Sequence, residues 1–95
     1  MILLKKETLD DGRVYLAGQP ENVCSRVMEV ILNGDVVEDA RITGGCGGNT
    51  QGVTCLMKGM KVDEVIGRIG GIDCGGRGTS CPDQLSQLLK LYKDA

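Results

Sequence analysis

Residues 24–42 read CSRVMEVILNGDVVEDARI, and this stretch decides the fold. Apolar and polar residues alternate before and after the segment Asn33-Gly34-Asp35. Alternation with a period of two is typical of strands, and a short run of Asn, Gly and Asp between two such segments is typical of a tight turn. The stretch therefore predicts a β-hairpin.

The positions of two glutamates bear on the length of the hairpin loop. A two-residue Asn-Gly loop would place Glu29 opposite Glu38, whereas a three-residue loop pairs Leu32 with Val36 on an apolar face. Like charges directly opposite each other in an antiparallel pair are unfavourable. We therefore expect the three-residue loop.

The rest of the chain adds one strand before the hairpin and helices after it. Residues 13–17 follow the turn signal at 10–12 and are expected to form a strand. Apolar residues then recur at helical spacing, which predicts a helix over residues 49–58, a second over 62–69 and a third that begins at Cys81-Pro82-Asp83. Strands first and helices second predict an α+β fold, in which a three-stranded antiparallel sheet carries about three helices on one face.

Composition limits the classes of function. The chain has 95 residues, which fits one domain over residues 1–95, and its net charge is -2. There is no basic stripe and almost no aromatic residue to stack on bases, so nucleic-acid binding is disfavoured. The apolar start at residues 1–4 is too short for a signal peptide and no later stretch would span a membrane, so we expect a cytoplasmic protein.

Five cysteines and no histidine dominate the chemistry. The odd count and the lack of an export signal favour metal ligands or redox thiols over a disulfide scaffold. Without imidazole, any metal must be held by thiolate, carboxylate, backbone or water. Four of the cysteines fall at the ends of predicted elements, namely Cys24, Cys46, Cys74 and Cys81, and Cys46 and Cys74 lie within the glycine-rich clusters at 44–48 and 70–78.

Position separates these four cysteines from the fifth. Cys46 and Cys81 immediately precede predicted helices, where free backbone N–H groups and the helix dipole stabilise a thiolate. Cys55 lies inside the first predicted helix beside apolar residues, and we expect it to be a buried small hydrophobe.

Two chemistries remain open for the four thiols. They would hold zinc tetrahedrally or an iron–sulfur cluster, with Asp73 and Asp83 supporting the ligands. Alternatively, Cys74 and Cys81, the most closely spaced pair, would cycle between dithiol and disulfide as a relay. The oligomeric state stays open, because an edge strand of so small a sheet needs covering.

Four segments resemble the TSCPD domain family in its short stand-alone form: GTSCPDQL at 78–85, NVCS at 22–25, GGCGGNTQG at 44–52 and GIDC at 71–74. The resemblance covers about residues 22–91. The hallmark of that family is a set of four motif cysteines, which fall here on Cys24, Cys46, Cys74 and Cys81.

The TSCPD resemblance also implies a context. The domain occurs at the end of some adenosylcobalamin-dependent ribonucleotide reductases, and short forms often carry a ribonucleoside-diphosphate reductase label. The chain is too short for the reductase barrel, which leaves open an accessory role as the alternative, in which paired thiols pass reducing equivalents to a ribonucleotide reductase.

A second resemblance is to iron–sulfur cluster scaffolds of the IscU and NifU amino-terminal type. It rests on CSRVMEV at 24–30, VVEDARI at 36–42, GCG at 45–47 and KGMKVDEV at 58–65, with Cys81 in the place of that family's third cysteine. This similarity implies an IscU/NifU-like fold and, as a further alternative, a scaffold or carrier that hands a cluster to an iron–sulfur client protein.

Overall fold

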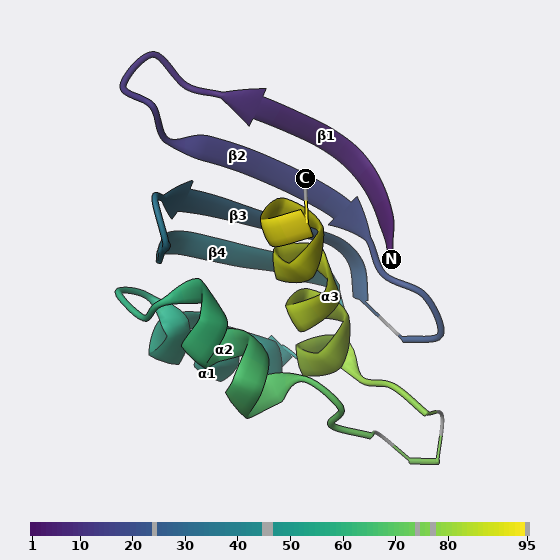
Figure 1. The fold of residues 1–95 in the computed structure, drawn as a ribbon. Helices are drawn as coiled ribbons and strands as arrows, with labels where there is room; N and C mark the ends of the chain where they lie inside the picture. The colour runs from purple at the N-terminus through teal and green to yellow at the C-terminus, as the bar shows by residue number, and fades with distance from the viewer. Residues whose placement is uncertain (24, 45–46, 74, 77, 95) are drawn as a thin grey trace.

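The computed structural model describes residues 1–23, 25–44, 47–73, 75–76 and 78–94. Over these residues an antiparallel sheet has its strands side by side in chain order (Figure 1): β1 (Ile2–Thr8), β2 (Val14–Gln19), β3 (Ser25–Asn33) and β4 (Val36–Gly44). Three helices follow: α1 (Gly47–Met57), α2 (Val62–Ile69) and α3 (Cys81–Asp94). The predicted α+β class is confirmed.

The prediction of three strands was wrong, because β1 adds a fourth at the edge of the sheet. β1 pairs with β2 through the backbone, and all of its side chains are exposed. Its apolar residues come first and its polar residues last, so the strand shows no alternation. Edge strands hold their place by backbone hydrogen bonds and often carry lysine, as β1 does at Lys5 and Lys6.

The hairpin of β3 and β4 is confirmed, but the predicted three-residue loop was wrong. Asn33 pairs with Val36, which leaves only Gly34 and Asp35 in the loop. Gly34 has a φ of +61°, a left-handed conformation that glycine adopts without steric cost.

An irregularity further along the hairpin changes the residue that lies opposite Glu29. The register shifts between Ile31 and Leu32, and as a result Glu29 lies opposite Arg41. An extra residue in one strand of an antiparallel pair is a β-bulge. The Gly34-Asp35 loop already excludes the pairing of Glu29 with Glu38, because its unshifted register would place Glu29 opposite Ala40. The bulge then moves Glu29 from Ala40 to Arg41, a residue of opposite charge.

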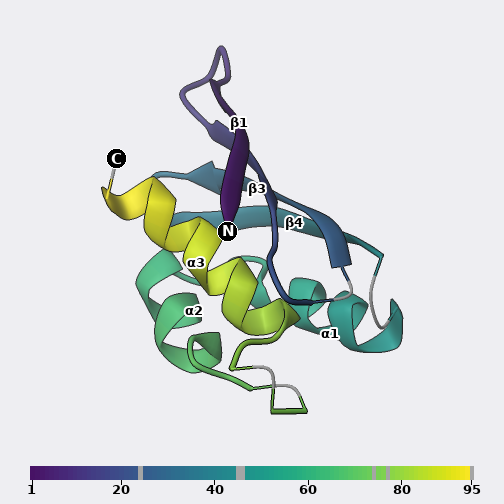
Figure 2. The ribbon, with the colours of Figure 1, turned by 90° about the vertical axis from the view of Figure 1, so that its right-hand side faces the viewer.

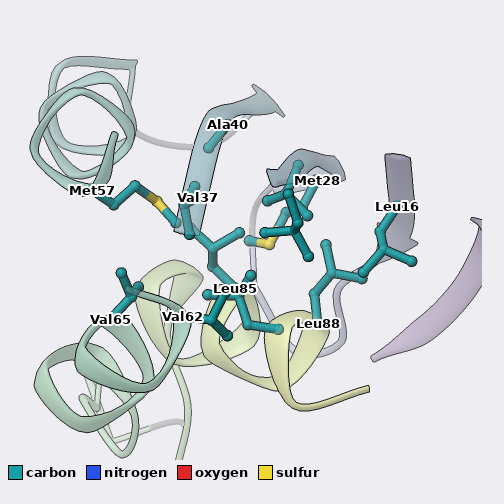
Figure 3. Packing of buried hydrophobic residues seen from close by; sticks show 12 residues of the cluster. Leu16, Met28, Val37, Ala40, Met57, Val62, Val65, Leu85 and Leu88 are labelled. Carbon is teal, nitrogen blue, oxygen red and sulfur yellow. The ribbon is translucent and has the colours of Figure 1, made fainter. Parts of the chain in front are cut away.

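The helices pack on one face of the sheet, and the core lies between the two layers (Figure 2). Figure 3 shows side chains from both layers meeting there. The sheet contributes Leu16, Met28, Val30, Leu32, Val37 and Ala40, and the helices contribute Met57, Val62, Val65, Leu85, Leu88 and Leu89. All of these residues are aliphatic, as expected for a chain without Phe or Trp.

The turn between α1 and α2 is fixed to the outer edge of β4. Val37 donates its backbone N–H to the carbonyl of Met60 (2.9 Å) and accepts the N–H of Gly59 (2.8 Å). Val62, the first residue of α2, donates its N–H to the carbonyl of Asp35 (2.7 Å). These bonds cover part of that sheet edge and set the position of α2.

The helix boundaries agree closely with the sequence prediction. α2 covers the predicted residues and α3 begins at Cys81, while α1 begins two residues before the predicted start at 49. Across the described ranges, no helix is both long and apolar enough to span a membrane.

Candidate cysteine site

The predicted site residues differ in how far the structure places them. Cys24, Cys46 and Cys74 lie outside the described residues. Cys81 is the first residue of α3 and is half-buried. Among the described residues alone, no group of three or more His, Cys, Asp or Glu side chains is arranged to hold a metal ion.

A described residue that follows Cys24 contacts Cys81, and it pairs with a residue two positions before Cys46. Ser25, at the start of β3, pairs with Gly44, at the end of β4. The Ser25 side chain is buried, and its Oγ lies 3.2 Å from the Sγ of Cys81. The beginning of β3, the end of β4 and the beginning of α3 therefore meet at one place.

The first turns of α1 also lie close to Cys81. A narrow pocket beside Cys81 is lined by Ile42 of β4, Thr50 and Val53 of α1, and Pro82 of α3. α1 begins at Gly47, the residue after Cys46. Two helix amino termini thus approach the same end of the sheet, and helix amino termini favour negative charge such as that of a thiolate.

Local sequence fixes the start of α3. The hydroxyl oxygen of Ser80 accepts the N–H of Asp83 (3.1 Å), and the carbonyl of Ser80 accepts the N–H of Gln84 (2.8 Å). Ser80 is therefore the N-cap, and Cys81 and Pro82 occupy the first turn, where proline loses no helical hydrogen bond. Capping at Ser80 thus fixes Cys81 as the first residue of α3.

Asp83 ties the two ends of the α2–α3 loop together. Its carboxylate accepts the hydroxyl of Thr79 (2.5 Å), the backbone N–H of Gly71 (2.6 Å) and the side-chain amide of Gln87 (3.2 Å). The hydroxyl of Thr79 contributes most to lowering the pKa of Asp83 below its ordinary value of 3.8; the N–H of Gly71 adds to this, and burial opposes it. Asp83 is thus a buried anion held by hydrogen bonds, and it closes the loop that contains Cys74.

Asp73 organises the interior of that loop. Its two carboxylate oxygens accept the backbone N–H groups of Gly76 (2.9 Å) and Gly78 (2.5 Å). Gly78 has a φ of +79°, which a residue with a side chain rarely adopts. The sequence predicted Asp73 and Asp83 as supporting residues of the cysteine site, and in the structure both of them brace the loop around Cys74.

Two further residues of this region were not singled out from the sequence. Ser25 follows Cys24 directly, but its contact with Cys81 spans 56 positions in the chain. Gln84 accepts the backbone N–H of Glu21 (3.1 Å) and donates to Thr79 Oγ1 (2.9 Å). Both contacts are long-range or depend on helix orientation, so no local pattern signals them.

Cys55 corrects a sequence-based expectation. It was predicted to be buried, but it is exposed on α1, and its neighbour Leu56 is 79% exposed. Among residues 50–57 of α1, whose burial the structure describes, the buried positions are Thr50, Thr54 and Met57, and their spacing of four and three residues marks the inward face. Two of these three residues are threonines, so apolar periodicity did not identify the inward face of α1.

Comparison with protein families adds an independent observation. A family model described as the TSCPD domain matches residues 7–93. Comparison with curated proteins and with solved structures gave no match.

Proposed function

The chain belongs to the TSCPD domain family, and from this premise we propose that it is a metal-binding module in which Cys24, Cys46, Cys74 and Cys81 hold one zinc ion or one iron–sulfur cluster. Thiolates are soft ligands that suit both centres, and the chain has no histidine to contribute an imidazole. The donor set is therefore four sulfurs.

The observation that carries the proposal is the contact between Ser25 and Cys81. Ser25 follows Cys24 in the chain, and consecutive Cα atoms are about 3.8 Å apart, so the contact brings the region of the first cysteine to the last one. Gly44, two residues before Cys46, pairs with Ser25. Gly71, three residues before Cys74, is bonded to Asp83, two residues after Cys81. Each proposed ligand thus has a near neighbour in one cluster of contacts.

The surrounding residues would orient the ligands. The hydroxyl of Ser25 is placed to donate a hydrogen bond to the sulfur of Cys81, and hydrogen bonds to ligating sulfurs tune both metal affinity and redox potential. Asp73 and Asp83 brace the glycine loop of Cys74. Bound zinc would cross-link the loops, and a bound cluster would supply electron transfer.

We assign the module an accessory role beside a larger enzyme. A ribonucleotide reductase and an iron–sulfur client protein are the two partners that the family resemblances suggest. The rival function is a thiol relay through Cys74 and Cys81, and it differs from metal binding in needing no bound metal.

The test is elemental analysis with a visible absorption spectrum on protein purified anaerobically. We expect zinc, or iron with sulfide, in wild type and its loss in Cys46→Ser and Cys81→Ser. Cys55→Ser is the matched control, because it makes the same change at an exposed cysteine, and it should keep the metal. Wild-type protein that folds normally, contains no metal and takes up none on reconstitution would refute the proposal and favour the relay.

A further inference from the structure

Gln84 joins two separate loops to the start of α3. Its side chain is buried, with 4% of the residue exposed. Its Oε1 accepts the backbone N–H of Glu21 in the β2–β3 loop (3.1 Å), and its Nε2 donates to the Oγ1 of Thr79 at the end of the α2–α3 loop (2.9 Å). Figures 1 and 2 show both loops extending from the same end of the molecule.

Both ends of this amide are used. Breaking these hydrogen bonds would cost free energy, because a buried amide without partners is unfavourable and because the N–H of Glu21 and the Oγ1 of Thr79 would also lose a partner. The oxygen of Gln84 contacts a backbone group, so the contact fixes the path of the chain at Glu21. Four residues after Glu21 the chain begins β3 at Ser25. The hydroxyl oxygen of Ser25 lies 3.2 Å from the Sγ of Cys81.

We propose that Gln84 is a positioning residue of the cysteine site. It holds the β2–β3 loop against α3, so that β3 begins with Ser25 already beside Cys81. The inference rests on the proposed metal-binding function, and it adds that metal affinity depends on a buried amide that is not itself a ligand.

The same helix offers a matched control. Gln87 lies one turn later, is half-buried, and donates to the Oδ2 of Asp83 (3.2 Å) within α3 itself. Gln84 instead reaches a different loop. Replacing either glutamine by methionine removes an amide and keeps a side chain of similar size, but only Gln84→Met removes a hydrogen bond to the β2–β3 loop.

The experiment measures two quantities in full-length wild type, Gln84→Met and Gln87→Met. The first is the zinc dissociation constant, from competition with a chromophoric chelator. The second is hydrogen–deuterium exchange of metal-free protein in peptides that contain residues 20–23. We expect Gln84→Met to weaken zinc binding about 10-fold or more and to speed exchange in these peptides. Gln87→Met should leave exchange in these peptides unchanged and should weaken zinc binding much less, because Asp83 keeps its hydrogen bonds from Thr79 and Gly71. Thermal unfolding of the metal-free proteins establishes that each variant is folded.

A second variant keeps the test decisive if Gln84→Met does not fold. Gln84→Glu retains an oxygen to accept the N–H of Glu21, so exchange at residues 20–23 should stay slow. Fast exchange in folded Gln84→Glu would overturn the inference, as would a folded Gln84→Met with wild-type exchange. An equal loss of zinc affinity in Gln87→Met would overturn it too.

The two proposals fail separately. If wild type binds no zinc and no cluster, the proposed function fails, and the exchange comparison alone decides whether Gln84 positions the loop. If wild type binds zinc and Gln84→Met binds it equally well, the metal-binding function stands and the role of Gln84 is refuted.

Discussion

Gly18 of β2 lies so close to Leu88 of α3 that a Cβ on Gly18 would stand 2.9 Å from the Cδ1 of Leu88. The Sδ of Met1 would be nearer still, at 2.6 Å. Leu88 is fully buried, and on the sheet Gly18 pairs with Met28. The missing side chain at residue 18 therefore sets how closely α3 approaches the sheet.

Gly18→Ala should destabilise the protein by about 1–3 kcal/mol, because the added methyl group overpacks the core. Both groups that it would meet are ends of flexible side chains, which keeps the cost within this range. Chemical denaturation measures the change. Gly52→Ala is the control: nothing lies within 4 Å of its added Cβ, and alanine favours α1, so stability should rise slightly.

Leu88→Ala should lower the free energy of unfolding by about 2–5 kcal/mol, the usual range for replacing a fully buried leucine by alanine. Combined with Gly18→Ala it should cost less than the sum of the two single changes, because the new methyl group then occupies the vacated space. A double-mutant cycle in urea measures this coupling. Strict additivity would show that Gly18 and Leu88 do not constrain each other.

Asp83→Asn should destabilise the protein by about 2–4 kcal/mol at neutral pH, since hydrogen bonds to a charged carboxylate are the stronger kind. The hydroxyl of Thr79 lowers the pKa of Asp83 in the folded state below its ordinary value of 3.8. A lowered pKa stabilises the fold above the unfolded-state value, and the gain disappears as the pH falls through the folded-state pKa.

The difference in free energy of unfolding between wild type and Asp83→Asn should therefore be largest at neutral pH and should decrease below about pH 4. Urea unfolding of both proteins between pH 3 and pH 7 measures it. A difference that stays constant over this range would mean that the charge of Asp83 does not contribute to stability.

Ser25→Ala should weaken zinc binding about 10-fold while the protein stays folded, because it removes the hydroxyl that is within hydrogen-bonding distance of the Cys81 sulfur. Ser86→Ala is the matched control. Ser86 is fully buried and donates to the carbonyl of Asp83, so its loss should lower stability without a comparable change in zinc affinity. Equal zinc affinity in wild type and Ser25→Ala would argue against a role for this hydroxyl.

Regular periodicity made much of the fold predictable. The alternation around Asn33 predicted the hairpin, and the spacing of Val62 and Val65 predicted α2. The fourth strand was missed because β1 buries no side chain and thus has no apolar face to detect. The inward face of α1 was misjudged because threonines occupy it, which left Cys55 on the outside.

The candidate site was predictable only in part. Asp83 stood out because it follows a cysteine and a proline at a helix start, where a carboxylate is favourable. The contacts of Ser25 and Gln84 arise from tertiary packing across 56 and 63 positions, and no local pattern encodes such contacts. The start of α3 at Cys81 was therefore predictable from the sequence, whereas the contacts of Ser25 and Gln84 were not.

β1 lies outside the group of residues that forms the interior. No residue of Ile2–Thr8 belongs to the core, and within the sheet the strand pairs with β2. Met1, directly before the strand, packs against the core and anchors that end of β1. Regions with few buried contacts open at a lower free energy than the core. The end of β1 at residues 5–8, where all side chains are exposed, should consequently separate from β2 at a lower free energy than is needed to open the core, while Met1 holds the other end.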